Sequence, residues 1–473
     1  MRVCAAGLAS LAVACGSAPV PASRATAPAT AVAPPSQAPS ETAVRASPAA
    51  TLDGGVAGAD ASRRETRLIA RMLKRVERAR GLTATKPVPG VLLDRPALIA
   101  QVKEHVAREL PESAIRNEGL TLQLLGFIPM EFDYEAAEYR LLQDQLAGYY
   151  EPSTGTMYMA SDLADDEAEA TLAHELVHAL QDQQWDLQER SKYRPGDGDR
   201  SEAVSALAEG DATSAMIDVM LGLSSPGGDK TAMDLPADLF SEQIRDGLDK
   251  GPGATAPHVM RNSLAAPYIY GTLFVNALRV RGGWDAVDRA WADPPTTTEQ
   301  IIHLEKWLAH EPAIPVAPPP YATLGVGWSV ADEDSEGELG TRVAFEEWVD
   351  APRAAKASIG WGGDRGVLLA KGDRSAFAWR VRYDPTQAKE PRAAAVYTAI
   401  AGGIDRTVAA PATSDAAFDC RERPDRGPLA IARAGADVIV VAGPAKTPAG
   451  GHWTSAGTCA TSRAWVTEIA RSR

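Results

Sequence analysis

Residues 165–185 read DDEAEATLAHELVHALQDQQW, and the rest of the chain is best interpreted outward from this stretch. Three acidic residues at its start favour a helix, because negative charge stabilises the positive end of the helix dipole. On such a helix His174 and His178 lie on one face about 6 Å apart, so both imidazoles can reach one Zn²⁺. Glu175 is rotated by about 100° from His174 and can address the open coordination position. There it would act as general base toward a metal-activated water.

A catalytic zinc needs a third protein ligand, with the fourth position left for water. Residues 200–216 read RSEAVSALAEGDATSAM and predict a second helix, whose small residues allow close packing. Glu202 and Glu209 lie on one face of it but about 10 Å apart along the axis, so only one can bind the metal. Glu209 is favoured because its neighbours are small or apolar, and a buried carboxylate needs a cation. Asp211 faces away and is expected to support the site or the backbone.

These two motifs together resemble the gluzincin branch of zinc metallopeptidases, the thermolysin-like superfamily. The resemblance rests on HELVH at 174–178 and ALAEGDA at 206–212, and it covers residues 140–310. It implies a zincin-like fold in which two helices supply His174, His178 and Glu209 to Zn²⁺. It also implies that the substrate is a peptide or a protein. The sequence that flanks the first motif is similar to that of a group of uncharacterised bacterial metallopeptidases. The chain departs from thermolysin in a longer gap between His178 and Glu209 and in lacking an Asn-Glu-x-x-Ser-Asp signature.

The same resemblance gives roles to residues on both sides of the two helices. Residues 148–158 read GYYEPSTGTMY and predict a hairpin at the place where gluzincins have the edge strand that binds extended substrate. Gluzincins also use a Tyr or His beyond the zinc ligands to stabilise the oxyanion, and the candidates here are Tyr268, Tyr270 and His303. His303 is placed one to two turns into a helix that starts with a capping box. Core packing is the alternative role for each of the three.

The N-terminus predicts export. Residues 1–15 contain an apolar run that is long enough for a signal peptide and too short to span a bilayer. The run ends in LAVAC and resembles a lipobox, with the leucine one residue further from Cys15 than usual. A lipoprotein signal and a plain secretory signal both fit. Residues 16–59 are rich in Ala, Pro, Ser and Thr and predict a disordered tether. The protein is therefore expected in the cell envelope, lipid-anchored through Cys15, or secreted.

Composition narrows the classes of partner. The chain has 473 residues and a formal net charge of −14, which argues against nucleic acid because phosphate recognition needs a basic surface. Contact with a membrane is expected only through an anchor on Cys15. The four cysteines exclude a Cys₄ zinc finger and an iron–sulfur protein, because two of them fall in residues 1–15. Cys420 and Cys459 remain, and in an exported protein they are expected to form a disulfide.

The expected fold class is α+β. Residues 60–318 are predicted to form a mainly helical zincin-like domain with a small substrate-binding sheet. A proline-rich stretch then precedes a smaller α+β domain over residues 319–473, in which we expect no second catalytic group and interpret residues 359–365 as a turn.

Two functions follow from this interpretation. The first is a zinc-dependent metallopeptidase in which His174, His178 and Glu209 bind the metal and Glu175 is the base. The alternative is a surface lipoprotein that uses a degenerate peptidase fold for binding or scaffolding. The intact His-Glu-x-x-His motif favours the first, and zinc content together with hydrolysis of an unfolded protein separates the two.

Overall fold

The computed structural model describes residues 11–13, 54–224, 230–236, 239–250, 252–385, 392–407, 412–447 and 452–472. The fold is α+β, as the sequence predicts. Of the predicted signal peptide only β1 (Leu11–Val13) is described. The predicted tether lies outside the described residues up to residue 53, and α2 (Gly54–Arg80) begins before the tether's expected end. Within the described ranges, none of the helices combines the length and the hydrophobicity that a membrane-spanning segment needs.

The N-terminal part of the chain forms a small sheet with the strand order β1-β3-β4-β2. Its other strands are β2 (Gly90–Leu93), β3 (Leu146–Glu151) and β4 (Thr156–Ala160). The predicted hairpin is confirmed, since β3 and β4 pair antiparallel with Tyr149 opposite Tyr158. Strand β2 runs parallel to β4, and β1 pairs antiparallel with the other edge of β3.

The sequence suggests that the helix before this hairpin extends to Gly148, and this is wrong. Helix α5 (Tyr134–Gln145) ends three residues earlier, and Gly148 lies inside β3. A Cβ at Gly148 would lie 2.7 Å from the backbone oxygen of Tyr158, so glycine is needed there for close pairing with β4 and not as a helix stop.

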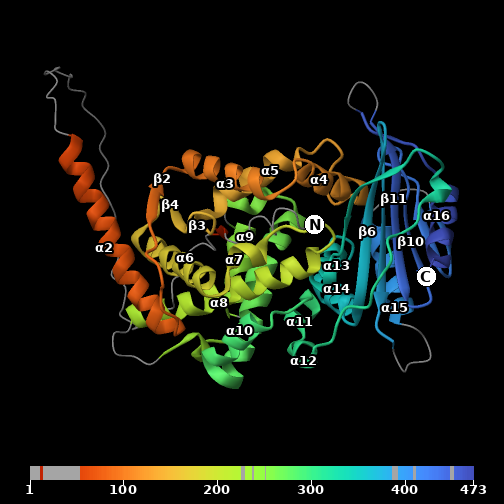
Figure 1. The fold of residues 1–473 in the computed structure, drawn as a ribbon. Helices are drawn as coiled ribbons and strands as arrows, with labels where there is room; N and C mark the ends of the chain where they lie inside the picture. The colour runs from red at the N-terminus through yellow and green to blue at the C-terminus, as the bar shows by residue number, and fades with distance from the viewer. Residues whose placement is uncertain are drawn as a thin grey trace, which may run out of the picture.

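Helices pack beside the small sheet, and three long ones form the centre of the molecule (Figure 1). These three are α6 (Asp165–Trp185), α8 (Gly198–Ser224) and α10 (His258–Ala292). The others are α3 (Arg95–Glu109), α4 (Ala114–Leu125), α7 (Leu187–Ser191), α9 (Leu239–Lys250), α11 (Thr298–Ile302) and α12 (Leu304–Leu308).

The C-terminal part is built on a second, antiparallel sheet with the order β5-β6-β7-β11-β10-β9-β8, and β12 pairs with β11. Its strands are β5 (Ser329–Asp334), β6 (Trp361–Lys371), β7 (Arg374–Tyr383), β8 (Ala412–Asp415), β9 (Phe418–Arg421), β10 (Leu429–Ala434), β11 (Asp437–Lys446) and β12 (Thr454–Ser455). Its helices are α13 (Gly337–Glu346), α14 (Ala351–Ser358), α15 (Arg392–Thr407) and α16 (Cys459–Arg471).

The interpretation of residues 359–365 as a turn is wrong, because β6 already begins at Trp361. Its glycines mark a close approach of two backbones. The N–H of Ile314 donates to the carbonyl of Gly362 at 2.6 Å, and a Cβ at Gly363 would lie 2.2 Å from the carbonyl oxygen of Ile314. The segment that leads into the proline-rich stretch therefore packs along β6.

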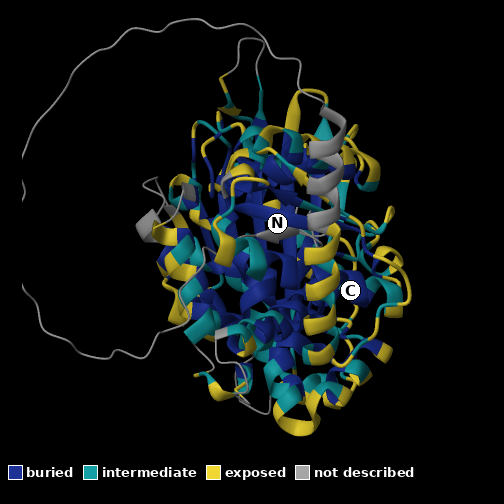
Figure 2. Ribbon diagram, turned by 90° about the vertical axis from the view of Figure 1, so that its left-hand side faces the viewer, coloured by how far each residue is buried: buried dark blue, intermediate teal, exposed yellow. Residues whose placement is uncertain are grey.

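Alternate residues of the large sheet face two different layers. One face packs under α16, where Trp465 is fully buried. The other face shares one continuous hydrophobic core with helices from the N-terminal part, for example Trp379 of β7 with Leu122 of α4 and Met260 of α10. Figure 2 shows that buried residues occupy the middle of the molecule and that exposed residues surround them. A core thus crosses the predicted 318/319 boundary, and the division into two domains stays a prediction.

The predicted disulfide is confirmed. Cys420 of β9 and Cys459 at the start of α16 are bonded, with their Cα atoms 5.8 Å apart. The bond ties the last helix to the sheet and closes a loop between residues that are 39 positions apart.

Candidate metal centre

Three potential metal ligands converge between α6 and α8. His174 and His178 lie one turn apart on α6, and Glu209 faces them from α8. The ligand atoms of these three residues all lie within 4.8 Å of one another, and all three side chains are buried. Glu202, the other candidate for the third ligand, also lies on α8. Among the described residues it does not belong to this group of ligand atoms. Glu175 lies beside His174 on α6 and is fully buried.

The spacing of the three atoms suits a small tetrahedral cation. The distance from His174 Nε2 to Glu209 Oε2 is 3.0 Å, from His174 Nε2 to His178 Nε2 3.0 Å, and from His178 Nε2 to Glu209 Oε2 3.5 Å. Ligands bound at about 2.0–2.1 Å around a tetrahedral Zn²⁺ lie roughly 3.3 Å apart. The geometry therefore fits zinc without rearrangement of either helix.

A hydrogen-bond chain orients the imidazole of His178 for metal binding. Gln181 Nε2 donates to the carbonyl of Ala208 at 3.0 Å, which turns Gln181 Oε1 toward His178. That oxygen lies 2.8 Å from His178 Nδ1 and can only accept, so Nδ1 carries the proton. In the neutral ring Nε2 then has its lone pair directed at His174 and Glu209, as metal binding requires. The sequence-based predictions do not include Gln181, although its position one turn after His178 would allow it to accept from that imidazole.

The buried carboxylate of Glu209 needs positive charge beside it. Burial lowers the pKa of His174, which is therefore poised as a neutral ligand. At His178 burial acts in the same direction, but the Glu209 carboxylate outweighs it and raises the pKa to about 9. Burial would raise the pKa of Glu209, yet the two histidines hold it below its ordinary value. A buried carboxylate thus stays ionised and needs positive charge, which either a proton or a divalent metal can supply.

Two glycines bring Glu209 to this position. Gly210 on α8 and Gly271 on α10 face each other where the two helices cross. A Cβ at Gly210 would lie 2.1 Å from the carbonyl carbon and oxygen of Gly271, and a Cβ at Gly271 would lie 1.8 Å from the carbonyl oxygen of Ala206. The backbones of α8 and α10 are therefore in direct contact beside Glu209.

A buried ion pair fixes the other side of α8. Asp211 accepts from Arg80 Nε of α2 at 2.5 Å and from Trp291 Nε1 of α10 at 2.8 Å. Arg80 is fully buried, and its guanidinium also lies over the ring of Trp284, 4.5 Å from the centroid. Asp211 thus ties α8 to α2 and α10, and its support of a metal site stays a prediction. The sequence does not predict Arg80 as its partner, because the two residues are 131 positions apart.

The three oxyanion candidates lie in different places. Tyr268 of α10 packs against the first histidine, with its ring centroid 6.1 Å from that of His174. Tyr270 lies under the guanidinium of Arg342 from α13, 5.1 Å from its centre. Only Tyr268 has a described ring contact with a member of the ligand group.

His303 is not one to two turns inside a helix, and this expectation is wrong. Helix α11 (Thr298–Ile302) has a single turn, and His303 is the cap between it and α12. Its Nε2 lies 3.0 Å from Glu338 of α13. The hydrogen bond to Glu338 raises the pKa of His303, so the two form an ion pair between the helical part and the C-terminal part.

A second group of carboxylates already has its cation. Glu299, Glu311 and Asp384 have oxygens within 4.8 Å of one another. Lys306 Nζ lies 2.6 Å from Glu299 and 2.7 Å from each of the other two. The ammonium group fills the space that a metal would need, so this group is a structural ion cluster.

Comparison with known proteins informs only the C-terminal part. A family model described as a domain of unknown function (DUF8575) matches residues 326–450, which run from β5 to β11 and include none of the three potential ligands. Searches of curated proteins and of solved structures found no match.

Proposed function

We propose that the protein is a zinc-dependent metallopeptidase of gluzincin type. The observation that carries this proposal is the convergence of His174 Nε2, His178 Nε2 and Glu209 Oε2 within 3.5 Å of one another. The hydrogen bond that directs the lone pair of His178 inward supports it further. These three side chains would hold the zinc.

The remaining residues divide the chemistry among them. When bound, zinc would activate a water molecule and polarise the substrate carbonyl. Glu175 takes the proton from the attacking water on a carboxylate oxygen and then gives it to the leaving amine. Tyr268, stacked beside His174, is the group we assign to stabilise negative charge on the carbonyl oxygen. Tyr270 and His303 are weaker candidates, since Arg342 and Glu338 are their described partners.

The edge of β3 supports a peptide as the substrate. The chain's own segment Leu11–Val13 pairs there antiparallel, with Leu11 opposite Tyr149 and Val13 opposite Leu146. This edge can therefore form main-chain hydrogen bonds with an extended peptide, which is a common mode of peptide recognition.

Export is part of the proposal. The Cys420–Cys459 disulfide supports it, because such bonds persist in oxidising compartments and are rare in the cytosol. A lipid anchor on Cys15 and a place in the cell envelope are proposed on the sequence alone.

The test combines metal analysis with hydrolysis of unfolded casein. Wild type should bind one zinc per chain and cleave casein. Glu175→Gln should keep the zinc and lose cleavage, because an amide cannot accept a proton from water. Glu209→Ala should lose both, and Glu202→Gln, the matched control on the same helix, should lose neither.

Each result distinguishes between the assignments. Loss of zinc in Glu202→Gln but not in Glu209→Ala would make our ligand assignment wrong. Zinc binding without hydrolysis of any protein would reject the enzyme and favour the alternative, a degenerate peptidase fold used for binding.

A further inference from the structure

A large cavity lies between the helical part and the C-terminal part. Its volume is about 480 Å³, within the range of about 300–1,000 Å³ that is typical of ligand sites. Helices α9 and α10 form one wall and α13 and the start of α14 form the other. Neither the proposed metal ligands nor Glu175 lines it.

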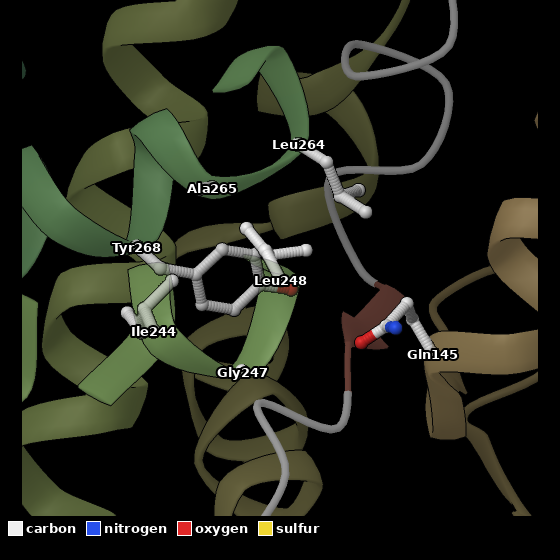
Figure 3. A pocket seen from close by; sticks show the side chains of 7 residues that line it. All are labelled: Gln145, Ile244, Gly247, Leu248, Leu264, Ala265 and Tyr268. Atoms are coloured by element: carbon white, nitrogen blue, oxygen red, sulfur yellow. The ribbon is translucent and has the colours of Figure 1, made fainter. Parts of the chain in front are cut away.

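This cavity adjoins a smaller one beside Tyr268. Leu248 and Ala265 line both it and a smaller cavity that contains Tyr268 and Gln145. Figure 3 shows Tyr268 beside Leu248, with Gln145 on the opposite side. Tyr268 packs on His174, and Gln145 directly precedes β3. The smaller cavity thus connects the larger one with the surroundings of His174 and the start of β3.

The acidic groups of the larger cavity already have partners. Asp249 forms an ion pair with Arg261. Glu346 accepts from Asn262 Nδ2 at 2.7 Å and lies 3.7 Å from Arg342 Nε. His258, at the rim, is paired with Glu347 at 2.8 Å.

Two guanidinium groups remain with unused hydrogen-bonding capacity. Arg245 is exposed, and no acidic side chain in the described part of the chain lies within ion-pair distance of it. Arg342 Nε is buried and has no hydrogen-bond partner among the described residues. Both arginines line this cavity, Arg245 from α9 and Arg342 from α13, and the guanidinium of Arg342 lies over the ring of Tyr270. Glu346 pairs with Arg342 alone, so among the described residues the charge of Arg245 is without a carboxylate partner.

We propose that this cavity binds a carboxylate of the peptide substrate between Arg245 and Arg342. Guanidinium groups bind carboxylates through paired hydrogen bonds, and a partly buried site strengthens them. The carboxylate can belong to an acidic side chain or to the peptide's C-terminus. This inference rests on the proposed function, which it extends from peptides in general to peptides that carry a negative charge on one side of the cleaved bond.

The test uses the full-length chain and one set of matched casein-derived peptides, centred on a cleaved bond or, where casein is not cleaved, on a fixed reference bond. Glutamate is moved through the positions that flank the cleaved bond and compared with glutamine, and each peptide is made with a free or an amidated C-terminus. At one position, or at the C-terminus, the carboxylate should raise kcat/KM about tenfold to a hundredfold, as expected for hydrogen bonds to a charged group. Arg342→Gln and Arg245→Gln should each remove most of this preference, and Arg281→Gln, an exposed change on α10, should keep it.

Direct binding separates this inference from the proposed function. Titration of the same peptides into wild type and both arginine variants by calorimetry needs no turnover. Cleavage without a carboxylate preference, or a preference that survives both substitutions, would overturn the inference and leave the peptidase intact. Carboxylate-dependent binding that needs Arg342, without cleavage of any peptide, would keep the cavity and reject the peptidase. Absence of both would reject both.

Discussion

The proposed metal centre requires glycine at positions 210 and 271, where the backbones of α8 and α10 are in contact, and replacing Gly210 with alanine tests this. The added Cβ would lie 2.1 Å from the backbone of Gly271, where about 3.5 Å is needed between carbon atoms. The helices α8 and α10 would therefore have to separate by about 1.4 Å. No side chain can rotate to relieve the clash, because the opposing atoms belong to a helix backbone.

The expected cost follows from two opposing effects. Overpacking of a core costs typically 1–3 kcal/mol, and a backbone clash belongs at the upper end. Alanine in place of glycine returns about 1 kcal/mol through helix propensity. The net loss of about 2 kcal/mol should lower Tm by roughly 4–8 °C if the helical part unfolds as one cooperative unit of about 150–250 residues. Zinc affinity should fall more than tenfold, because Glu209 would be displaced by far more than the roughly 0.2 Å that ligand distances tolerate.

Gly222→Ala is the matched control, because it lies on the same helix and a Cβ there meets nothing within 4 Å. It should leave zinc affinity unchanged and hold or slightly raise Tm. Thermal unfolding with and without zinc, together with zinc titration against a chelator, gives both quantities. If Gly210→Ala and Gly222→Ala behave alike, the close crossing does not position Glu209 and the reasoning fails.

Three further predictions concern the surroundings of the site. Gln181→Leu should weaken zinc binding by about 10–100-fold, because His178 Nδ1 loses the oxygen that accepts its proton; a chelator competition in which the variant binds zinc as tightly as wild type would contradict this. Arg80→Met should cost about 3–5 kcal/mol in urea unfolding because it leaves Asp211 buried without its partner, and adding Asp211→Asn should recover part of that loss; a cost below 1 kcal/mol would refute it. At Glu151 burial would raise the pKa, but His105, Ser153 and Arg108 together lower it from 4.5 to about 2. The ionised form of Glu151 therefore stabilises the fold above pH 4.5, and this contribution is lost as the pH falls toward 2. Glu151→Gln should therefore be about 2 kcal/mol less stable than wild type at pH 7, with a gap that narrows below pH 4.5; a gap independent of pH would show that the charge is not what matters.

Local patterns predicted those elements that short-range physics determines. Helix α6 has the predicted bounds, Asp165–Trp185, since acidic residues mark its start and an apolar face runs along it. The β3–β4 hairpin follows from its turn residues and the flanking aromatic residues. Because two histidines at this spacing share a helix face wherever the helix packs, the meeting of His174 and His178 could also be predicted.

The errors arise where a distant partner decides the outcome. The sequence predicts a helix stop at Gly148 and a turn at Gly363, yet each is a glycine because another backbone passes close to it. The sequence does not reveal the partner of His303, because Glu338 lies 35 residues further along the chain. A single sequence contains no information about which of several acidic residues a given histidine will meet.

The large cavity joins the two parts of the chain that the sequence separates. Arg342 and Glu346 come from α13, inside the segment that matches the family of unknown function, whereas Arg245 and Asn262 come from the helical part. The hydrophobic core that crosses the 318/319 boundary holds these walls at a fixed separation. If the cavity selects substrate, then the C-terminal part contributes half of a specificity site and cannot be removed without changing what is cleaved. Substrate choice would then depend on this packing, while the proposed metal ligands depend only on α6 and α8.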